Sequence, residues 1–205
     1  MNGGLSAASG GMSRTSHEMS TSYSPPDWIK LGAHFDVENV TNEGWLLDHG
    51  AIELQFELLT AGASGGIALG WAAYVRISTD DASTNSLIFG PILKFSSKAA
   101  SFTLNSYLED TFGRNDESGL AVLYGWQGRL DVREGIAVGI EGYGKIDNIA
   151  DPPPLNEQDH RIGPAVYIWS EIDPGRTISL DTALVFGLTN VAPDASLKFN
   201  LGTTF

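Results

Sequence analysis

Apolar and polar residues alternate along most of the chain after Lys30. The clearest segments carry apolar residues at Leu31, Ala33, Phe35 and Val37, at Ile52, Leu54, Phe56 and Leu58, and at Leu69, Trp71, Ala73, Val75 and Ile77. Similar segments follow up to Phe205. A period of two is that of a β-strand, in which successive side chains point to opposite faces. The pattern predicts an all-β fold of about ten antiparallel strands over residues 30–205, preceded by a flexible leader over residues 1–29.

The two faces of these strands differ in charge, because no position on the apolar face is charged. The opposite face carries Asp36, Glu38, Glu53, Glu57, Arg76, Lys94, Glu109, Arg129, Asp131, Glu141, Arg161, Asp181 and Lys198. A soluble barrel buries its apolar face in a core, whereas a membrane barrel turns the same face outward to lipid. Alternation alone therefore fits both kinds of barrel.

Long and short connections also alternate along the chain. Short turns are expected at 60–66, 96–101, 133–135 and 171–176, and longer connections at 39–51, 78–86, 109–119 and 144–159. Barrels of the bacterial outer membrane have tight turns at one rim and extended loops at the other. This alternation favours a closed, up-and-down transmembrane β-barrel with both termini at the short-turn rim. Phe95, Phe102 and Phe205, near that rim and on the apolar face, suit the headgroup level of a bilayer.

The C-terminal segment is the most specific motif. It reads Leu197-Lys198-Phe199-Asn200-Leu201-Gly202-Thr203-Thr204-Phe205. It resembles the closing strand of outer-membrane β-barrel proteins, which ends in Phe after apolar residues at alternate positions and is read by the barrel-assembly machinery. The resemblance implies that Phe199, Leu201 and Phe205 form an assembly signal, although Thr203 replaces a larger apolar residue.

A looser resemblance covers roughly the last half of the chain. The segment 186–194, followed by Leu197-Lys198-Phe199, is similar to the end of a poorly characterised, porin-like family of proteobacterial barrels, some of which are encoded in operons for degrading aromatic compounds. Segments 138–142 and 160–164 are similar to the preceding strands of that family. The resemblance implies a place in the outer membrane of a Gram-negative bacterium and a role in transport. Outer-membrane lipid and the barrel-assembly machinery are the expected partners, and no catalytic residues are implied.

Composition narrows the chemistry further. The net charge of -13 argues against nucleic acid as a partner, because phosphates require a basic surface. The absence of cysteine excludes disulfides and thiolate metal sites. Met1–Tyr23 lacks the apolar stretch of a secretory signal, so we expect that an export signal has been removed or lies upstream of Met1.

The histidines offer no clear metal or catalytic site. The four residues are His17, His34, His49 and His160, and they form no close pair at metal-ligand spacing. Asp48-His49, Asp159-His160 and the pair Asp80-Asp81 are expected in loops at one rim, where an acid–histidine arrangement could form. No Gly-x-Ser-x-Gly nucleophile motif accompanies them. We therefore expect no enzyme activity, no bound metal and no cofactor.

Charged residues of the polar face are expected to line the barrel interior. These are Glu53, Glu57, Arg129, Asp131, Glu141, Arg161 and Asp181. Opposite charges could pair across a narrow lumen and plug it, or they could line a thin polar path in which the acidic excess favours cations. The sequence predicts an outer-membrane barrel that is structural, a narrow passive pore or a transporter. Two alternatives stay open: a soluble barrel that binds a small apolar ligand, and an outer-membrane hydrolase active at the rim.

Overall fold

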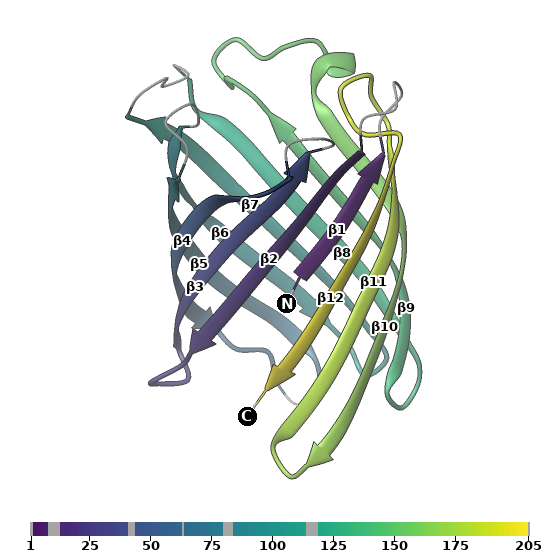
Figure 1. Cartoon of the computed structure of the whole chain (residues 1–205). Helices are drawn as coiled ribbons and strands as arrows, with labels where there is room; N and C mark the ends of the chain where they lie inside the picture. Colours follow the sequence, from purple (N-terminus) through teal and green to yellow (C-terminus); the bar gives the residue numbers. More distant parts are fainter. Residues whose placement is uncertain are drawn as a thin grey trace.

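The computed structural model describes residues 2–7, 13–40, 44–62, 64–79, 84–113 and 119–204. Twelve strands of this described part form one closed antiparallel barrel (Figure 1). They are β1 (Asn2–Ala7), β2 (Ser13–Tyr23), β3 (Ile29–Val40), β4 (Gly44–Leu59), β5 (Gly66–Ser78), β6 (Asn85–Ser96), β7 (Ala100–Phe112), β8 (Ala121–Arg133), β9 (Ile136–Ile146), β10 (Asp159–Asp173), β11 (Arg176–Gly187) and β12 (Ala195–Thr204). A short 3-10 helix, η1 (Leu155–Glu157), lies between β9 and β10. Among the described residues, no helix is long and apolar enough to cross a membrane.

Each strand pairs with its neighbour in sequence, and β1 closes the barrel by pairing with both β2 and β12. The predicted fold class, a closed up-and-down antiparallel barrel, is confirmed. The expected count of about ten strands is too low by two, because β1 and β2 lie within the segment expected to be a leader. The last strand, β12, pairs with β11 and β1, so β1 and β2 stand between β12 and β3.

The first two strands do not show the alternation because small or polar residues predominate on both of their faces. The sequence of β2 is SRTSHEMSTSY, in which Met19 and Tyr23 are the apolar members of a face otherwise made of small or polar residues. Backbone pairing nevertheless runs along the whole strand, from Arg14 opposite Val40 to Tyr23 opposite Leu31. The leader expected over residues 1–29 is therefore wrong for Asn2–Ala7 and Ser13–Tyr23.

The two rims differ as expected from the connections. The lower rim of Figure 1 has the connections 24–28, 97–99, 134–135 and 174–175, and the fully described connections of the upper rim are 147–158 and 188–194. The long connection expected at 39–51 is wrong, because β3 and β4 extend into it and leave only 41–43 between them. The chain ends at the lower rim, whereas β1 begins part-way up the wall (Figure 1).

Apolar side chains cover the outside of the barrel. Ile52 is 64% exposed and Ile140 51% exposed, although each lies well inside its strand. Trp71, Val138, Val166 and Leu184 are exposed as well, and Leu54 and Phe56 are partly buried. Phe205 lies outside the described residues.

The inner face carries small and polar residues. Ala72 and Ala137 are fully buried. The charged residues Glu53, Glu109 and Glu141 are each more than nine-tenths buried. The polarity of a water-soluble fold is thus inverted, since large apolar residues are exposed while carboxylates are buried.

Candidate functional site in the barrel lumen

Small residues on the inner wall of β9, β10 and β11 make room for aromatic rings. Ala137, Ala165 and Ala183 pack with Val185 around Tyr167, which is 1% exposed. A Cβ atom at Gly139 would lie only 3.0 Å from the Tyr167 ring, so the ring rests directly on the backbone of β9. The wall therefore holds Tyr167 in one position, with its hydroxyl directed at the neighbouring strand.

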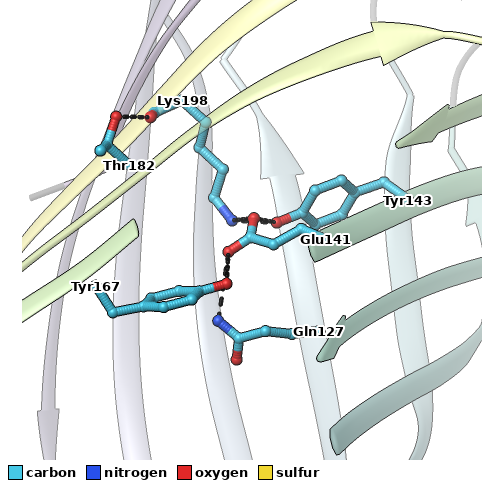
Figure 2. Close-up of polar contacts among 6 residues, drawn as sticks. All are labelled: Gln127, Glu141, Tyr143, Tyr167, Thr182 and Lys198. Atoms are coloured by element: carbon cyan, nitrogen blue, oxygen red, sulfur yellow. Dashed lines mark hydrogen bonds and ion pairs between the residues drawn. The ribbon is translucent and has the colours of Figure 1, made fainter. Parts of the chain in front are cut away.

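Glu141 on β9 is the acceptor at the centre of this wall (Figure 2). Tyr167 donates to its Oε1 atom at 2.9 Å, and Gln127 on β8 donates to the same atom at 3.3 Å. Lys198 on β12 donates to Oε2 at 2.8 Å, and the Tyr143 hydroxyl also donates to Oε2. Four donors therefore satisfy a carboxylate that is 3% exposed, as a buried charge requires. We call these five residues the Glu141 cluster.

Glu53 on β4 has a similar arrangement on another part of the wall. His34 on β3 lies 3.1 Å from Oε2, Tyr74 on β5 donates to Oε1 at 3.0 Å, and the Lys30 ammonium lies 3.2 Å from Oε1. The second ring nitrogen of His34 lies 3.4 Å from Glu18 on β2. We call these five residues the Glu53 cluster. Its contacts join four consecutive strands, from β2 to β5.

Arg129 lies below the Glu141 cluster, on the lower part of β8. Its guanidinium carbon is 4.3 Å from the centroid of the Trp169 ring and 5.3 Å from that of Tyr167, which are cation–π distances. Its Nε atom is 3.2 Å from Asp131. Arg129 and Asp131 therefore form a local pair beside two inner aromatic rings rather than a bridge across the lumen.

The remaining residues predicted to line the lumen lie nearer its ends. Arg161 pairs with Asp159 at the upper end of β10. Glu57 is exposed at the lower end of β4. Asp181 is partly buried on β11, within electrostatic range of Arg129, Glu141 and Lys198. The structure thus places Glu141, Arg129 and Asp181 near one another, and it separates them from Glu53, which belongs to the other cluster.

Two cavities open between these groups. One of about 190 Å³ is lined by Thr103, Asn105, Gly125, Trp126, Gln127, Glu141, Tyr143 and Lys198. Another of about 310 Å³ is lined by Glu18, His34, Asp36, Ala51, Tyr74, Arg76, Ile88, Tyr107 and Leu123. Most groups in both linings are polar or charged. Each cavity can hold water or a small polar solute.

The rim histidines are not brought together. His49 lies on β4, 2.8 Å from Asp48, whereas His160 lies on β10 between Tyr124 at 2.7 Å and Gln158 at 3.0 Å. Six strand spacings separate β4 from β10 around a twelve-strand barrel, so the two histidines are on opposite walls. Asp80 and Asp81 lie outside the described residues. Among the described residues, no group of three or more His, Asp or Glu is arranged to hold a metal ion.

The residues of the expected assembly signal are only partly described. Leu201 is exposed on the outer face of β12. Phe199 lies edge-on to His17 of β2, with ring centroids 6.2 Å apart. The two rings meet across Gly3 of β1, which is opposite both residues in the register and has no side chain to separate them.

Sequence reasoning missed the donors that satisfy the buried carboxylates. Tyr143 and Tyr167 share the inward phase with Glu141, and Tyr74 shares it with Glu53. A tyrosine on the polar face of a strand is a usable signal, because a buried phenol needs an acceptor. The sequence contains no comparable indication that Lys198 pairs with Glu141, since β12 and β9 are three strands apart in the sheet.

Comparison with known proteins supports the fold. The sequence matches no protein-family model and no curated protein. Among solved structures, the barrel is similar to NanC porin, with 10% identity, a TM-score of 0.62, and coverage of 100% of this chain and 97% of that chain. It is also similar to KdgM porin, with 9% identity, a TM-score of 0.54, and coverage of 100% and 96%. At this identity the likeness establishes a shared barrel fold.

The Glu141 cluster predicts a specific order of stability losses. Glu141→Ala should lower the free energy of unfolding by about 3 kcal/mol, because it leaves the Lys198 ammonium and two phenols without their acceptor. Tyr167→Phe removes one hydrogen bond and should cost about 1–2 kcal/mol. Glu57→Gln, an exposed control at the end of β4, should change stability by less than about 0.5 kcal/mol. Urea unfolding of the refolded barrel measures all three, and equal effects of Glu141→Ala and Glu57→Gln would contradict the assignment.

Proposed function

We propose that this protein is a narrow channel in the outer membrane of a Gram-negative bacterium, through which small polar solutes pass. The observation that carries the proposal is the inverted polarity of a closed barrel. Exposed aliphatic side chains such as Ile52 and Ile140 surround a wall whose inner carboxylates are buried. Lipid is the solvent that suits such an outer surface, and a barrel without edges leaves no unpaired strand in it.

The dimensions of the wall agree with this proposal. Strands β2–β12 contain 10 to 16 residues, and about 9–11 residues suffice for a tilted strand to cross the hydrocarbon core. Exposed aromatic residues lie near both ends of the strands: Tyr23, Trp28, Phe95 and Phe102 toward the lower rim, and Trp45 and Phe112 toward the upper rim. Aromatic rings at two levels suit the two interfaces of a bilayer.

The character of the interior favours a polar solute. Both described lumen cavities are lined by carboxylates, phenols and basic groups. A soluble barrel that binds an apolar ligand would need an apolar interior. The two structures most useful for comparison are called porins, and KdgM porin was also solved in complex with disordered oligogalacturonate. A rim hydrolase is less well supported, because His49 and His160 lie on opposite walls.

Channel activity is testable in a planar bilayer. The purified barrel, refolded in detergent and added at low concentration, should produce discrete, uniform current steps in KCl. Heat-denatured protein at the same concentration is the control, since it retains the sequence without the barrel. A barrel that inserts into vesicles but carries no current would overturn the channel and leave a structural role.

We also propose that the C-terminal strand directs assembly of the barrel by the barrel-assembly machinery, with Phe199, Leu201 and Phe205 as the signal. The support is the resemblance of this strand to outer-membrane closing strands and its position next to the closing strand β1. Deletion of Phe205 should reduce the amount of protein in the outer membrane of cells while leaving refolding in detergent largely intact. Quantitative blotting of membrane fractions measures the first effect, and an unchanged yield would contradict the proposal.

A further inference from the structure

The inner carboxylates differ in whether they have bonded partners. The Glu53 and Glu141 carboxylates are satisfied by three and four donors, respectively. Asp36 on β3 and Asp181 on β11 are partly buried, and neither makes a hydrogen bond or ion pair with any residue the structure describes. A satisfied carboxylate has few lone pairs left for a passing ion, whereas Asp36 and Asp181, which have no bonded partner in the described part of the chain, keep their lone pairs for one.

The two aspartates lie on one row of the barrel wall. Asp181 is opposite Asn200, Asn200 is opposite Asn2, Asn2 is opposite Glu18, and Glu18 is opposite Asp36. Residues directly opposite each other in an antiparallel pair share a face and have Cβ atoms about 5 Å apart. We call these five positions the Asp36–Asp181 row.

The row climbs along the lumen because the strands are tilted. Neighbouring strands lie about 4.8 Å apart and tilt about 35–45° from the axis of a membrane barrel. Four strand spacings separate Asp181 from Asp36, so the row rises by about 11–14 Å between them. It therefore follows a spiral path up the wall instead of a ring at one level.

The surroundings of the row suit brief interactions with ions. The cavity of about 310 Å³ exposes Asp36 and Glu18 at the upper part of the row. The ionisable groups in electrostatic range of Asp36 include Glu18, Asp48, Arg76 and His49, and those near Asp181 include Arg129, Glu141 and Lys198. Since no described group of three ligands could hold a metal ion, Asp36 and Asp181 offer single carboxylates at two separate levels of the wall. Conduction needs such weak, multiple sites, because a tight site would trap the ion.

We propose that the Asp36–Asp181 row is a path for small monovalent cations, and that Asp36 and Asp181 make the channel prefer cations to anions. This inference rests on the proposed channel function. It assigns selectivity to two aspartates that accept no bond from the residues the structure describes, and it assigns structural roles to the buried carboxylates of Glu53 and Glu141.

Reversal potentials in a KCl gradient across a planar bilayer test the row. Asp36→Asn and Asp181→Asn should each lower the ratio of K⁺ to Cl⁻ permeability by about twofold, and the double variant by about fourfold, as expected for removing one nearby charge at a time. Glu134→Gln in the turn between β8 and β9 removes the same charge away from the row and should leave the ratio unchanged. Asn200→Asp adds a carboxylate to the row and should raise the ratio by about twofold, independently of any folding defect in the other variants.

The outcomes separate the row from the channel itself. The variants Asp36→Asn, Asp181→Asn and Asn200→Asp could conduct with the same ratio of K⁺ to Cl⁻ permeability as the unaltered protein. That result would overturn the role of the row in selectivity and leave the channel function intact. An equal fall in Glu134→Gln would also overturn it, because total charge would then set the selectivity. Absence of current in the unaltered protein would overturn the channel function and, with it, the row.

Discussion

Closure of the backbone hydrogen-bond ladder is the constraint on which this structure depends. A barrel in lipid has no water to satisfy an open strand edge, and each unsatisfied group costs several kcal/mol. Strand β1 is only six residues long, yet it pairs with β2 on one side and β12 on the other and so joins the two ends of the sheet. The polar strands β1 and β2 are thus as necessary to the fold as the apolar strands that follow them.

Closure also creates a narrow interior in which charged side chains must find partners. The Glu141 cluster ties β12 to β9 and the Glu53 cluster ties β2 through β5, so each connects strands on one side of the closing strand β1. Both clusters use the same chemistry, a carboxylate surrounded by phenol and ammonium donors. Asp36 and Asp181 differ in this respect from paired inner carboxylates such as Glu109, which lies 3.0 Å from the Lys145 ammonium.

The sequence predicts those strands in which apolar and polar residues alternate, because their two faces lie in different environments. From Leu31 onward, the outer surface and the lumen carry apolar and polar residues in turn, and the fold class follows from this alternation. The strands β1 and β2 were missed because they consist largely of small and polar residues, and backbone pairing, which leaves no trace in side-chain pattern, holds them in place. The inner clusters were missed in part for a similar reason, because the Lys198–Glu141 contact depends on curvature that brings β12 toward β9. The alternation of apolar and polar positions predicts that Glu53 and Glu141 point inward. It does not distinguish a carboxylate with hydrogen-bond donors around it from one without them.

The most direct test of the central claim, that the apolar face is outside and the polar face inside, is the fluorescence of two single-tryptophan variants in lipid vesicles. Trp71 is exposed on the outer wall, and Trp169 lies on the inner wall against Arg129. With the other four tryptophans replaced by Phe, Trp71 should be quenched by lipids with brominated acyl chains and protected from aqueous iodide. Trp169 should be unaffected by the brominated lipids. Quenching of Trp71 by iodide without any effect of brominated lipid would contradict the account.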